Sequence, residues 1–250
     1  MNPILIEIGP LTIHSYGFFI ALAFLAGIAM TIKEAKWRNL PHQIVSDLSF
    51  YIILRAIIGS RLLYIILNPL YFLDNPWQIF MFWKGGLVFL GGGILATAIV
   101  IWFLRKHKQP FWPWADAIAP GLALGQCIGR IGCLMAGCCY GKQCSLPWSI
   151  TFFDSDSLAP LHVALHPTQI YHSLAGLLTF IILIKAKNYL PRQGQLMGLF
   201  LVIYSILRFN IEFFRADYRG EFFILSMTQL ISILVFFAGL YIIINRQWAK

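Results

Sequence analysis

The sequence predicts an all-α integral membrane protein with seven transmembrane helices. Of its 250 residues, 59% are hydrophobic and only 12% are charged, against about 25% charged in an average soluble domain. Seven stretches approach the roughly 20 apolar residues that cross a bilayer, and Lys and Arg are unevenly divided between the segments that connect them. The low charge excludes a disordered chain, a coiled coil and an ordinary soluble enzyme.

The predicted spans follow one another within a single domain of residues 1–250. The fourth is the weakest, because we expect Pro120 and several glycines to break its helix. The first contains no basic leader and is preceded by Glu7, so we expect a span and not a cleaved signal peptide. Membrane-crossing strands are not expected, since the apolar runs are long and continuous. The spans cover approximately residues 11–32, 48–67, 86–104, 115–135, 168–186, 195–214 and 224–244.

The orientation of the spans follows from the basic residues in the connecting segments. Eleven of the 19 Lys and Arg lie in alternate connections and at the C-terminus, and four lie in the other connections. The positive-inside rule therefore predicts a periplasmic N-terminus and a cytoplasmic C-terminus, as an odd number of spans requires. Residues 137–167 would form a small periplasmic cap. The net charge of +9 fits this topology and contact with anionic membrane lipids, and no nucleic-acid partner is expected.

Four arginines are left inside the predicted spans. Each costs about 2.5–3.5 kcal/mol at a helix centre unless it is compensated. Only two acids, Glu212 and Asp116, lie in or near spans, so ion pairs alone leave about two cations unmatched, and an anionic ligand would balance them. Arg61 is close enough to the end of its span to snorkel to the outer interface. The four are Arg55, Arg61, Arg130 and Arg208.

Spacing places several of these charges together. Tyr204, Arg208 and Glu212 are separated by four residues each, so they share one helix face, and Arg215 continues that face. Arg130 lies between Gly129 and Gly132, where small residues allow a ligand close to the backbone. Guanidinium groups bind phosphate in a bidentate manner. We therefore expect a phosphate, carried by a phospholipid headgroup, between Arg130 and Arg208.

A glycine-rich segment, residues 83–93, opens the third span. It lacks the spacing of a nucleotide-binding loop, and it fits equally well an unwound helix beside a cavity or a close helix–helix contact. His14 and His166 open spans from the outer side, whereas we expect His172 to be a hydrogen-bonded helix-end residue.

The chain has five cysteines, clustered between positions 127 and 144. No C-x2-C pair occurs, so no metal is expected, and small buried packing residues are the preferred interpretation. The three nearest the outer face could form a disulfide. The five are Cys127, Cys133, Cys138, Cys139 and Cys144.

Taken in order, several motifs resemble the bacterial phosphatidylglycerol–prolipoprotein diacylglyceryl transferases. Each motif is short, but the ordered set spans nearly the whole chain. The matching segments are residues 14–17 (HSYG), 83–87 (WKGGL), 91–92 (GG), 129–132 (GRIG), 137–141 (GCCYG), 166–171 (HPTQIY), 208–209 (RF) and 212–215 (EFFR).

The resemblance implies a seven-span enzyme of the bacterial inner membrane that acts in lipoprotein biogenesis. Such an enzyme transfers the diacylglyceryl group of phosphatidylglycerol to the lipobox cysteine of a prolipoprotein signal peptide, forming a thioether and releasing glycerol phosphate, without a cofactor. It implies that Arg130, Arg208, Glu212 and Tyr204 are catalytic. The substrate-binding residues that it implies are Tyr16, His14, Gly91, Gly92, His166, Gln169 and Arg215.

The chain departs from the family pattern at three positions. Many members carry His where Leu90 stands, Asn at Cys133 and Glu at Cys138. The general base therefore stays open between Glu212, His14 and His166.

Other functions remain as alternatives. A paralogue with an altered substrate would share the motifs. A transporter or flippase for an anionic lipid or small anion would share the buried arginines, and a non-catalytic scaffold would leave them unexplained.

Overall fold

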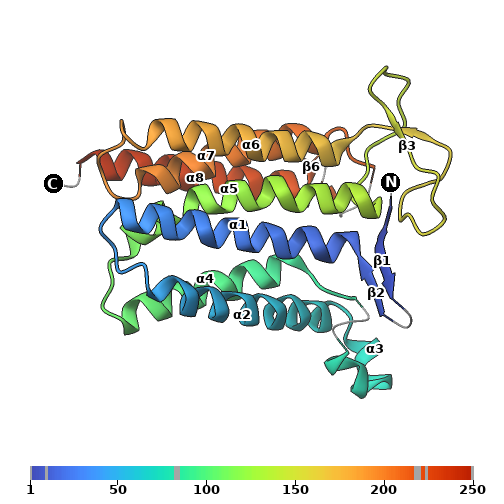
Figure 1. The fold of residues 1–250 in the computed structure, drawn as a ribbon, viewed down its shortest axis with the longest axis horizontal. Helices are drawn as coiled ribbons and strands as arrows, with labels where there is room; N and C mark the ends of the chain where they lie inside the picture. The colour runs from blue at the N-terminus through green and yellow to red at the C-terminus, as the bar shows by residue number, and fades with distance from the viewer. Residues whose placement is uncertain (1, 9–10, 82–84, 217–220, 223–224, 249–250) are drawn as a thin grey trace. The chain divides into compact units, whose positions relative to one another are not determined.

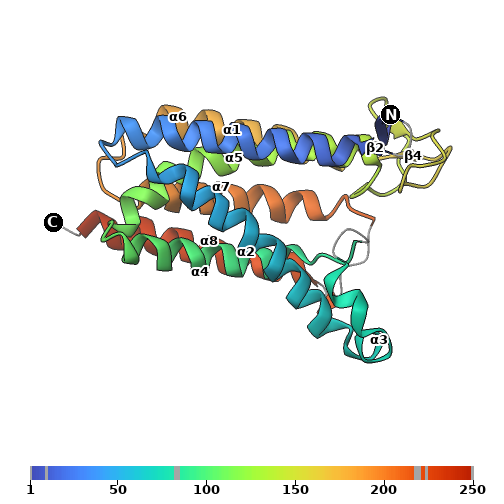
Figure 2. The same ribbon diagram turned by 60° about the horizontal axis from the view of Figure 1, so that its bottom comes forward.

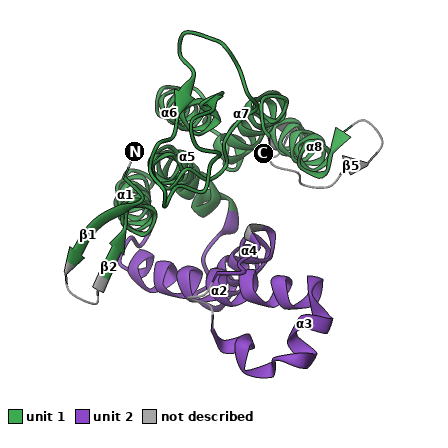
Figure 3. Cartoon of the chain, turned by 90° about the vertical axis from the view of Figure 1, so that its right-hand side faces the viewer, with its two compact units in different colours: residues 1–38, 112–250 green, residues 39–111 purple. Residues whose placement is uncertain are grey.

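The computed structural model describes the chain except for residues 1, 9–10, 82–84, 217–220, 223–224 and 249–250, and it consists mainly of long helices (Figure 1). Two compact units are present: unit 1 contains residues 1–38 and 112–250, and unit 2 contains residues 39–111 (Figure 3). Six helices of the described chain are long and apolar enough to cross a membrane, so the prediction of a helical membrane protein is confirmed. They are α1 (Ser15–Trp37), α2 (Ile44–Leu67), α5 (Phe111–Ala136), α6 (Thr168–Ala186), α7 (Gln195–Glu212) and α8 (Met227–Trp248).

The third predicted span corresponds to helix α4 (Phe89–Lys106), which is not among these six. The helix begins three residues later than expected, because Gly85 and Gly86 adopt positive φ angles of 88° and 71° and precede it. The seven-span count therefore remains a prediction.

Two predicted spans begin too early. Residues expected to open the first form strand β2 (Leu11–His14), which pairs antiparallel with β1 (Ile4–Ile8). Apolar and polar side chains alternate along β2, a pattern typical of a strand. Likewise, β6 (Leu225–Ser226) pairs with β5 (Glu221–Phe222) immediately before α8. Within the predicted cap, β3 (Ile150–Thr151) pairs with β4 (Ala164–Leu165).

Helix α5 runs without interruption through Pro120, so the prediction of a broken fourth span is wrong. Its glycines allow α1 to approach closely: a Cβ at Gly121 would lie 2.7 Å from the carbonyl oxygen of Gly27, and one at Gly125 would lie 3.3 Å from that of Ala23. Contacts of this kind are the usual source of helix association in lipid. Packing against α1 therefore favours a continuous helix despite the hydrogen bond that proline cannot donate.

The other long helices of unit 1 are arranged around α5. Helices α1, α5 and α6 run side by side in both ribbon views (Figures 1 and 2), and α7 packs against α6 and α8. Its apolar core joins α5, α6 and α7. The fully or almost fully buried core residues are Ala119, Ala123, Leu183, Leu196 and Phe200.

Buried charges tie the helices of unit 1 together at one end. Asp116 on α5 accepts hydrogen bonds from the backbone N–H groups of Gly194 (2.8 Å) and Met197 (2.9 Å) at the start of α7. The carboxylate thereby satisfies donors that a helix leaves unpaired in its first turn. A second buried acid, Glu34 on α1, pairs with Lys187 at 2.6 Å. Asp116 is thus a helix cap, a role that its position in the sequence did not suggest.

Unit 2 is built on the contact of α2 with α4, and the chain between them forms α3 (Pro69–Asp74) and the 3-10 helix η1 (Pro76–Phe80). Gly59 and Gly91 face each other so closely that a Cβ on either would clash with the carbonyl group of the other. A Cβ at Gly92 would likewise clash with the Ser60 hydroxyl. Helix packing, one of the two expectations for the glycine-rich segment, therefore accounts for Gly91 and Gly92.

Arg61 on α2 is 9% exposed, so the expectation that it snorkels is wrong. Its guanidinium donates to the carbonyl oxygens of Ile79 (3.1 Å), Gly85 (2.8 Å), Gly86 (3.2 Å) and Gln78. Among the described residues, backbone carbonyl dipoles compensate this charge. Two of these acceptors are in η1 and two precede α4, and together they keep the side chain from the surface.

Candidate active site

The predicted stripe on α7 is confirmed as a buried cluster of charges. The Arg208 Nη1 atom lies 2.7 Å from Glu212 Oε2, and both side chains are about 5% exposed. Arg215 Nε lies 3.7 Å from the same oxygen and is equally buried. The Ser226 hydroxyl donates to Glu212 Oε1 at 3.3 Å. Among the described residues, one carboxylate is therefore shared by two guanidinium groups.

His172 joins this cluster from α6. Its Nε2 atom lies 3.1 Å from Arg208 Nη1, and the side chain is 3% exposed. A guanidinium group can only donate, so Nε2 accepts and the proton of a neutral imidazole is on Nδ1. The expectation of an ordinary helix-end residue missed this role. One signal was available: Gln169, His172 and Gly176 share a face of α6 by their spacing, and that face is buried.

A cavity of about 10 Å³ lies between α5, α6 and α7 beside Arg208, large enough for about one water molecule. Tyr204 lines it together with His172 and Arg208, so the cavity is at the inner end of the α7 stripe. Gln126 and Thr179 add polar groups to its wall. The pocket thus has one guanidinium, one imidazole and one phenol group in its wall.

Arg130 and Tyr16 belong to the same part of unit 1. Arg130 is half-buried on α5 and lies within electrostatic range of Tyr16, His172 and Arg208. Tyr16, in the first turn of α1, is 45% exposed. Gly132 lets this turn approach α5, because a Cβ there would lie 3.3 Å from the Tyr16 carbonyl oxygen. Tyr16, Arg130 and Arg208 thus belong to the same part of unit 1, and their joint role in one site remains a prediction.

The motif of residues 166–171 holds the loop that follows α5. Gln169 is fully buried, and its Nε2 donates to the Cys138 carbonyl oxygen at 2.9 Å. Thr168, also fully buried, donates to the Cys139 carbonyl oxygen at 2.7 Å. His166 Nδ1 lies 3.2 Å from the Tyr171 hydroxyl. These contacts give the motif a structural role, and substrate contacts of His166 and Gln169 remain predictions.

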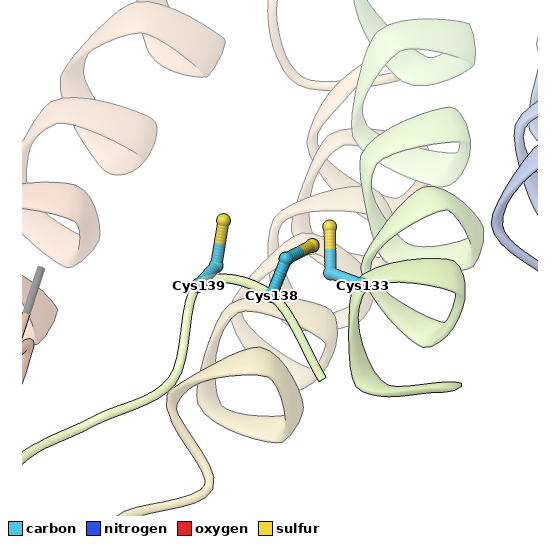
Figure 4. A group of neighbouring side chains, drawn as sticks. All are labelled: Cys133, Cys138 and Cys139. Carbon is cyan, nitrogen blue, oxygen red and sulfur yellow. The ribbon is translucent and has the colours of Figure 1, made fainter. Parts of the chain in front are cut away.

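Three of the five cysteines gather at the end of α5. Their Sγ atoms lie within 4.8 Å of one another (Figure 4). No disulfide links any of the five cysteines, all of which lie among the described residues. Interactions with Cys133 and Cys138, and then with the Arg215 guanidinium, lower the pKa of the Cys139 thiol. Contacts with Cys133 and Cys139 raise the pKa of Cys138. Spacing rules missed this cluster because a tight turn, and not a helix or a C-x2-C knuckle, creates it.

Three of the predicted substrate-binding residues lie outside the charged cluster around Arg208. His14 is exposed at the end of β2, directly before α1, and its side chain makes no capping hydrogen bond. Gly91 and Gly92 belong to unit 2, where they serve the packing described above. The neighbouring residues Trp83 and Lys84 are outside the described residues.

Comparison with known proteins gives consistent matches over nearly the whole chain. Residues 3–245 match the family model described as prolipoprotein diacylglyceryl transferase. A phosphatidylglycerol–prolipoprotein diacylglyceryl transferase of Clostridium tetani is 35% identical over 97% of this chain and 96% of that protein. A second protein of that name, from Clostridium perfringens, is 37% identical (96% and 93%), and one from Paracidovorax citrulli is 34% identical (100% and 98%).

Proposed function

The chain belongs to the prolipoprotein diacylglyceryl transferase family, and from this membership we propose how its buried charges act in catalysis. The enzyme transfers a diacylglyceryl group from phosphatidylglycerol to a prolipoprotein. The acceptor is the lipobox cysteine of the signal peptide, and glycerol phosphate is released. The family match covers both units, which supports a single transferase domain over residues 1–250.

The observation that carries the proposed mechanism is the excess of guanidinium groups around Glu212. Arg208 and Arg215 share that carboxylate, and Arg130 adds a third cation within electrostatic range of Arg208. Buried cations of this kind are stable when an anion completes the balance. The phosphate of phosphatidylglycerol is that anion in our proposal, with Arg130 and Arg208 as its clamp.

Stabilisation of the leaving phosphate is the main task of such a clamp. Negative charge grows on the phosphate oxygen as the bond to the glyceryl carbon breaks, and preformed cationic donors lower the energy of that transition state. Glu212 and His172 hold Arg208 from two sides and act as positioning residues. Tyr204 and Tyr16 donate hydrogen bonds to the headgroup. Arg215 extends the binding surface towards the end of α7.

The remaining predicted substrate residues act at the approach of the signal peptide and through the shape of the site in our proposal. We propose that His14 and His166 lie where the signal peptide approaches, since both flank helices at the same predicted outer side. Gln169 would act through the loop it holds, and Gly91 and Gly92 through the shape of unit 2. Glu212, His14 and His166 stay candidates for the base. The contacts of Glu212 with Arg208, Arg215 and Ser226 favour positioning over proton transfer for that residue.

We further propose seven spans in the bacterial inner membrane, with α4 as the seventh. Helix α4 ends in Arg105 and Lys106, which fits a cytoplasmic end under the positive-inside rule. The N-terminus would then be periplasmic, the C-terminus cytoplasmic, and the segment with β3 and β4 a small periplasmic cap. This topology places the α7 cluster near the outer leaflet, where secreted prolipoproteins emerge.

The experiment that tests the proposal is product analysis after reconstitution. The purified protein in phosphatidylglycerol liposomes should convert a lipobox peptide to its diacylglyceryl thioether, seen by mass spectrometry. Arg208→Lys should abolish most of this product, because Lys keeps the charge but not the bidentate geometry. Arg55→Lys is the matched control, since Arg55 lies exposed on α2. Lipid or anion flux without a thioether product would instead support the transporter alternative.

A further inference from the structure

Three thiols meet at the end of α5 without a role in the proposed phosphate clamp. Cys133 comes from the last turn of the helix, and Cys138 and Cys139 come from the loop that follows. Their sulfur atoms all lie within 4.8 Å of one another. In Figure 4 the Cys138 side chain points towards Cys133, and the sulfur atoms of Cys133 and Cys139 rise on the same side of the loop. Such a group can ligate one thiophilic metal ion.

The loop is held in a conformation that brings these thiols together. Gly137 has φ +73° and Cys139 has φ +60°, and a non-glycine residue in this left-handed region is uncommon unless the surroundings impose it. Fully buried Gln169 and Thr168 provide that constraint through the carbonyl groups of Cys138 and Cys139. Two side chains at the start of α6 therefore hold the turn in this conformation.

We propose that Cys133, Cys138 and Cys139 bind one Zn²⁺ ion, which takes the thiolate of the substrate cysteine as its fourth ligand. Zinc–sulfur bonds of about 2.3 Å in a tetrahedral site separate the sulfur atoms by about 3.8 Å, close to the spacing found here. Among the described residues, no fourth Cys, His, Asp or Glu completes the group. Three protein ligands with one open position are typical of catalytic zinc.

Charge and position both suit this ion. Three thiolates and Zn²⁺ leave one negative charge, and Arg215 lies next to Cys139, so its guanidinium can offset that charge. Arg215 also contacts Glu212, which holds Arg208. A substrate sulfur on zinc would therefore lie beside the proposed phosphate clamp.

The proposal that the substrate thiolate is the fourth zinc ligand rests on the proposed function. The lipobox thiol binds zinc as thiolate and gives its proton to water, because a metal-bound thiol is deprotonated. The sulfur electron pair forms the bond to the glyceryl carbon. The bond between that carbon and its phosphate oxygen breaks, and the oxygen keeps the electron pair as glycerol phosphate leaves. The thioether is a weaker ligand than the thiolate, so the product dissociates.

Metal content tests the site independently of activity. The protein purified without chelators should contain one zinc per chain by elemental mass spectrometry, and metal-free protein should take up one equivalent of added Zn²⁺. Cys133→Ser, Cys138→Ser and Cys139→Ser should each lose this zinc. Cys127→Ser and Cys144→Ser are matched controls that should keep it, since these thiols are outside the group. The zinc site would be refuted if the wild-type protein bound no zinc. It would also be refuted if the control variants lost as much zinc as the variants of the three proposed ligands.

Cobalt substitution tests the open position. Co²⁺ in place of zinc should show a sulfur-to-metal charge-transfer band, which should intensify on adding a lipobox peptide but not its Cys→Ser analogue. An unchanged band with both peptides would refute the fourth-ligand role. Full transferase activity in the zinc-free Cys139→Ser protein would refute it as well, with the proposed function intact. Bound zinc in a protein that makes no thioether would instead refute the proposed function and leave the metal site standing.

Discussion

Arg61 and Arg208 are both buried arginines within helices expected to lie in the membrane, but their surroundings differ. The Arg61 guanidinium in unit 2 donates to four backbone carbonyl oxygens and lies 5.3–5.6 Å from the Phe72 and Tyr64 rings. The Arg208 guanidinium in unit 1 contacts one shared carboxylate and a histidine, and it borders a cavity. Fixed carbonyl groups therefore mark Arg61 as a structural arginine, whereas the shared acid and the adjoining cavity are the surroundings in which we propose that Arg208 binds an anion.

The largest expected effect is on catalysis at Arg208. Arg208→Ala should lower the rate of lipid transfer by about 10²–10³-fold, the loss typical of removing one donor to a developing negative charge. Transfer to a lipobox peptide, followed by mass spectrometry, measures it. Arg55→Ala, exposed on α2, should transfer at close to the wild-type rate. Near-normal turnover in Arg208→Ala would show that Arg208 is not catalytic and that the two arginines do not differ in function.

Removal of the Arg61 side chain should affect stability first. Arg61→Ala leaves four carbonyl oxygens without their donor, so the unfolding free energy should fall by about 2–3 kcal/mol. Thermal unfolding in detergent micelles measures the change, with Arg55→Ala again as the control. If Arg61→Ala instead keeps its unfolding temperature and loses transfer activity, the two arginines do not differ as described.

Asp116 extends the comparison to an acid that serves structure. Asp116→Asn removes the negative charge that caps α7, so we expect a loss of about 1–2 kcal/mol. Thermal unfolding and faster amide exchange at Met197 would report it. Asp156→Asn, on an exposed loop, is the matched control. Equal unfolding temperatures for the two variants would argue against the cap.

The smallest expected effect is at His172, which we regard as a positioning residue. His172→Phe removes the imidazole acceptor of Arg208, leaves Glu212 in place and should lower kcat by about tenfold, equivalent to about 1.4 kcal/mol. His172→Gln retains an acceptor oxygen and should restore most of the activity. Failure of Gln to do better than Phe would show that packing, and not the hydrogen bond, explains the loss.

The sequence predicted those parts of the molecule that depend on local periodicity. The long apolar helices and the Tyr204–Arg208–Glu212 face repeat at fixed intervals, so both are visible before folding. The second partner of Arg208 was not predicted, because His172 is on another helix, 36 positions away. The surroundings of Arg61 were not predicted, because only acidic residues were considered as partners for its charge. Its acceptors are backbone carbonyl groups that are distant in the sequence. Continuity of α5 through Pro120 likewise depends on its contact with α1.

The unbroken length of α5 also sets the depth of the site. At about 1.5 Å per residue, its 26 residues extend about 39 Å, which exceeds the roughly 30 Å thickness of a hydrocarbon core. Measured from Phe111, Arg130 lies about 28 Å along the helix. In the proposed topology, with Phe111 at one interface, the Arg130 Cα lies close to the opposite edge of the hydrocarbon core, and its long side chain can extend to the lipid phosphates there. A phospholipid can therefore meet this arginine while its acyl chains stay at their normal height in the leaflet.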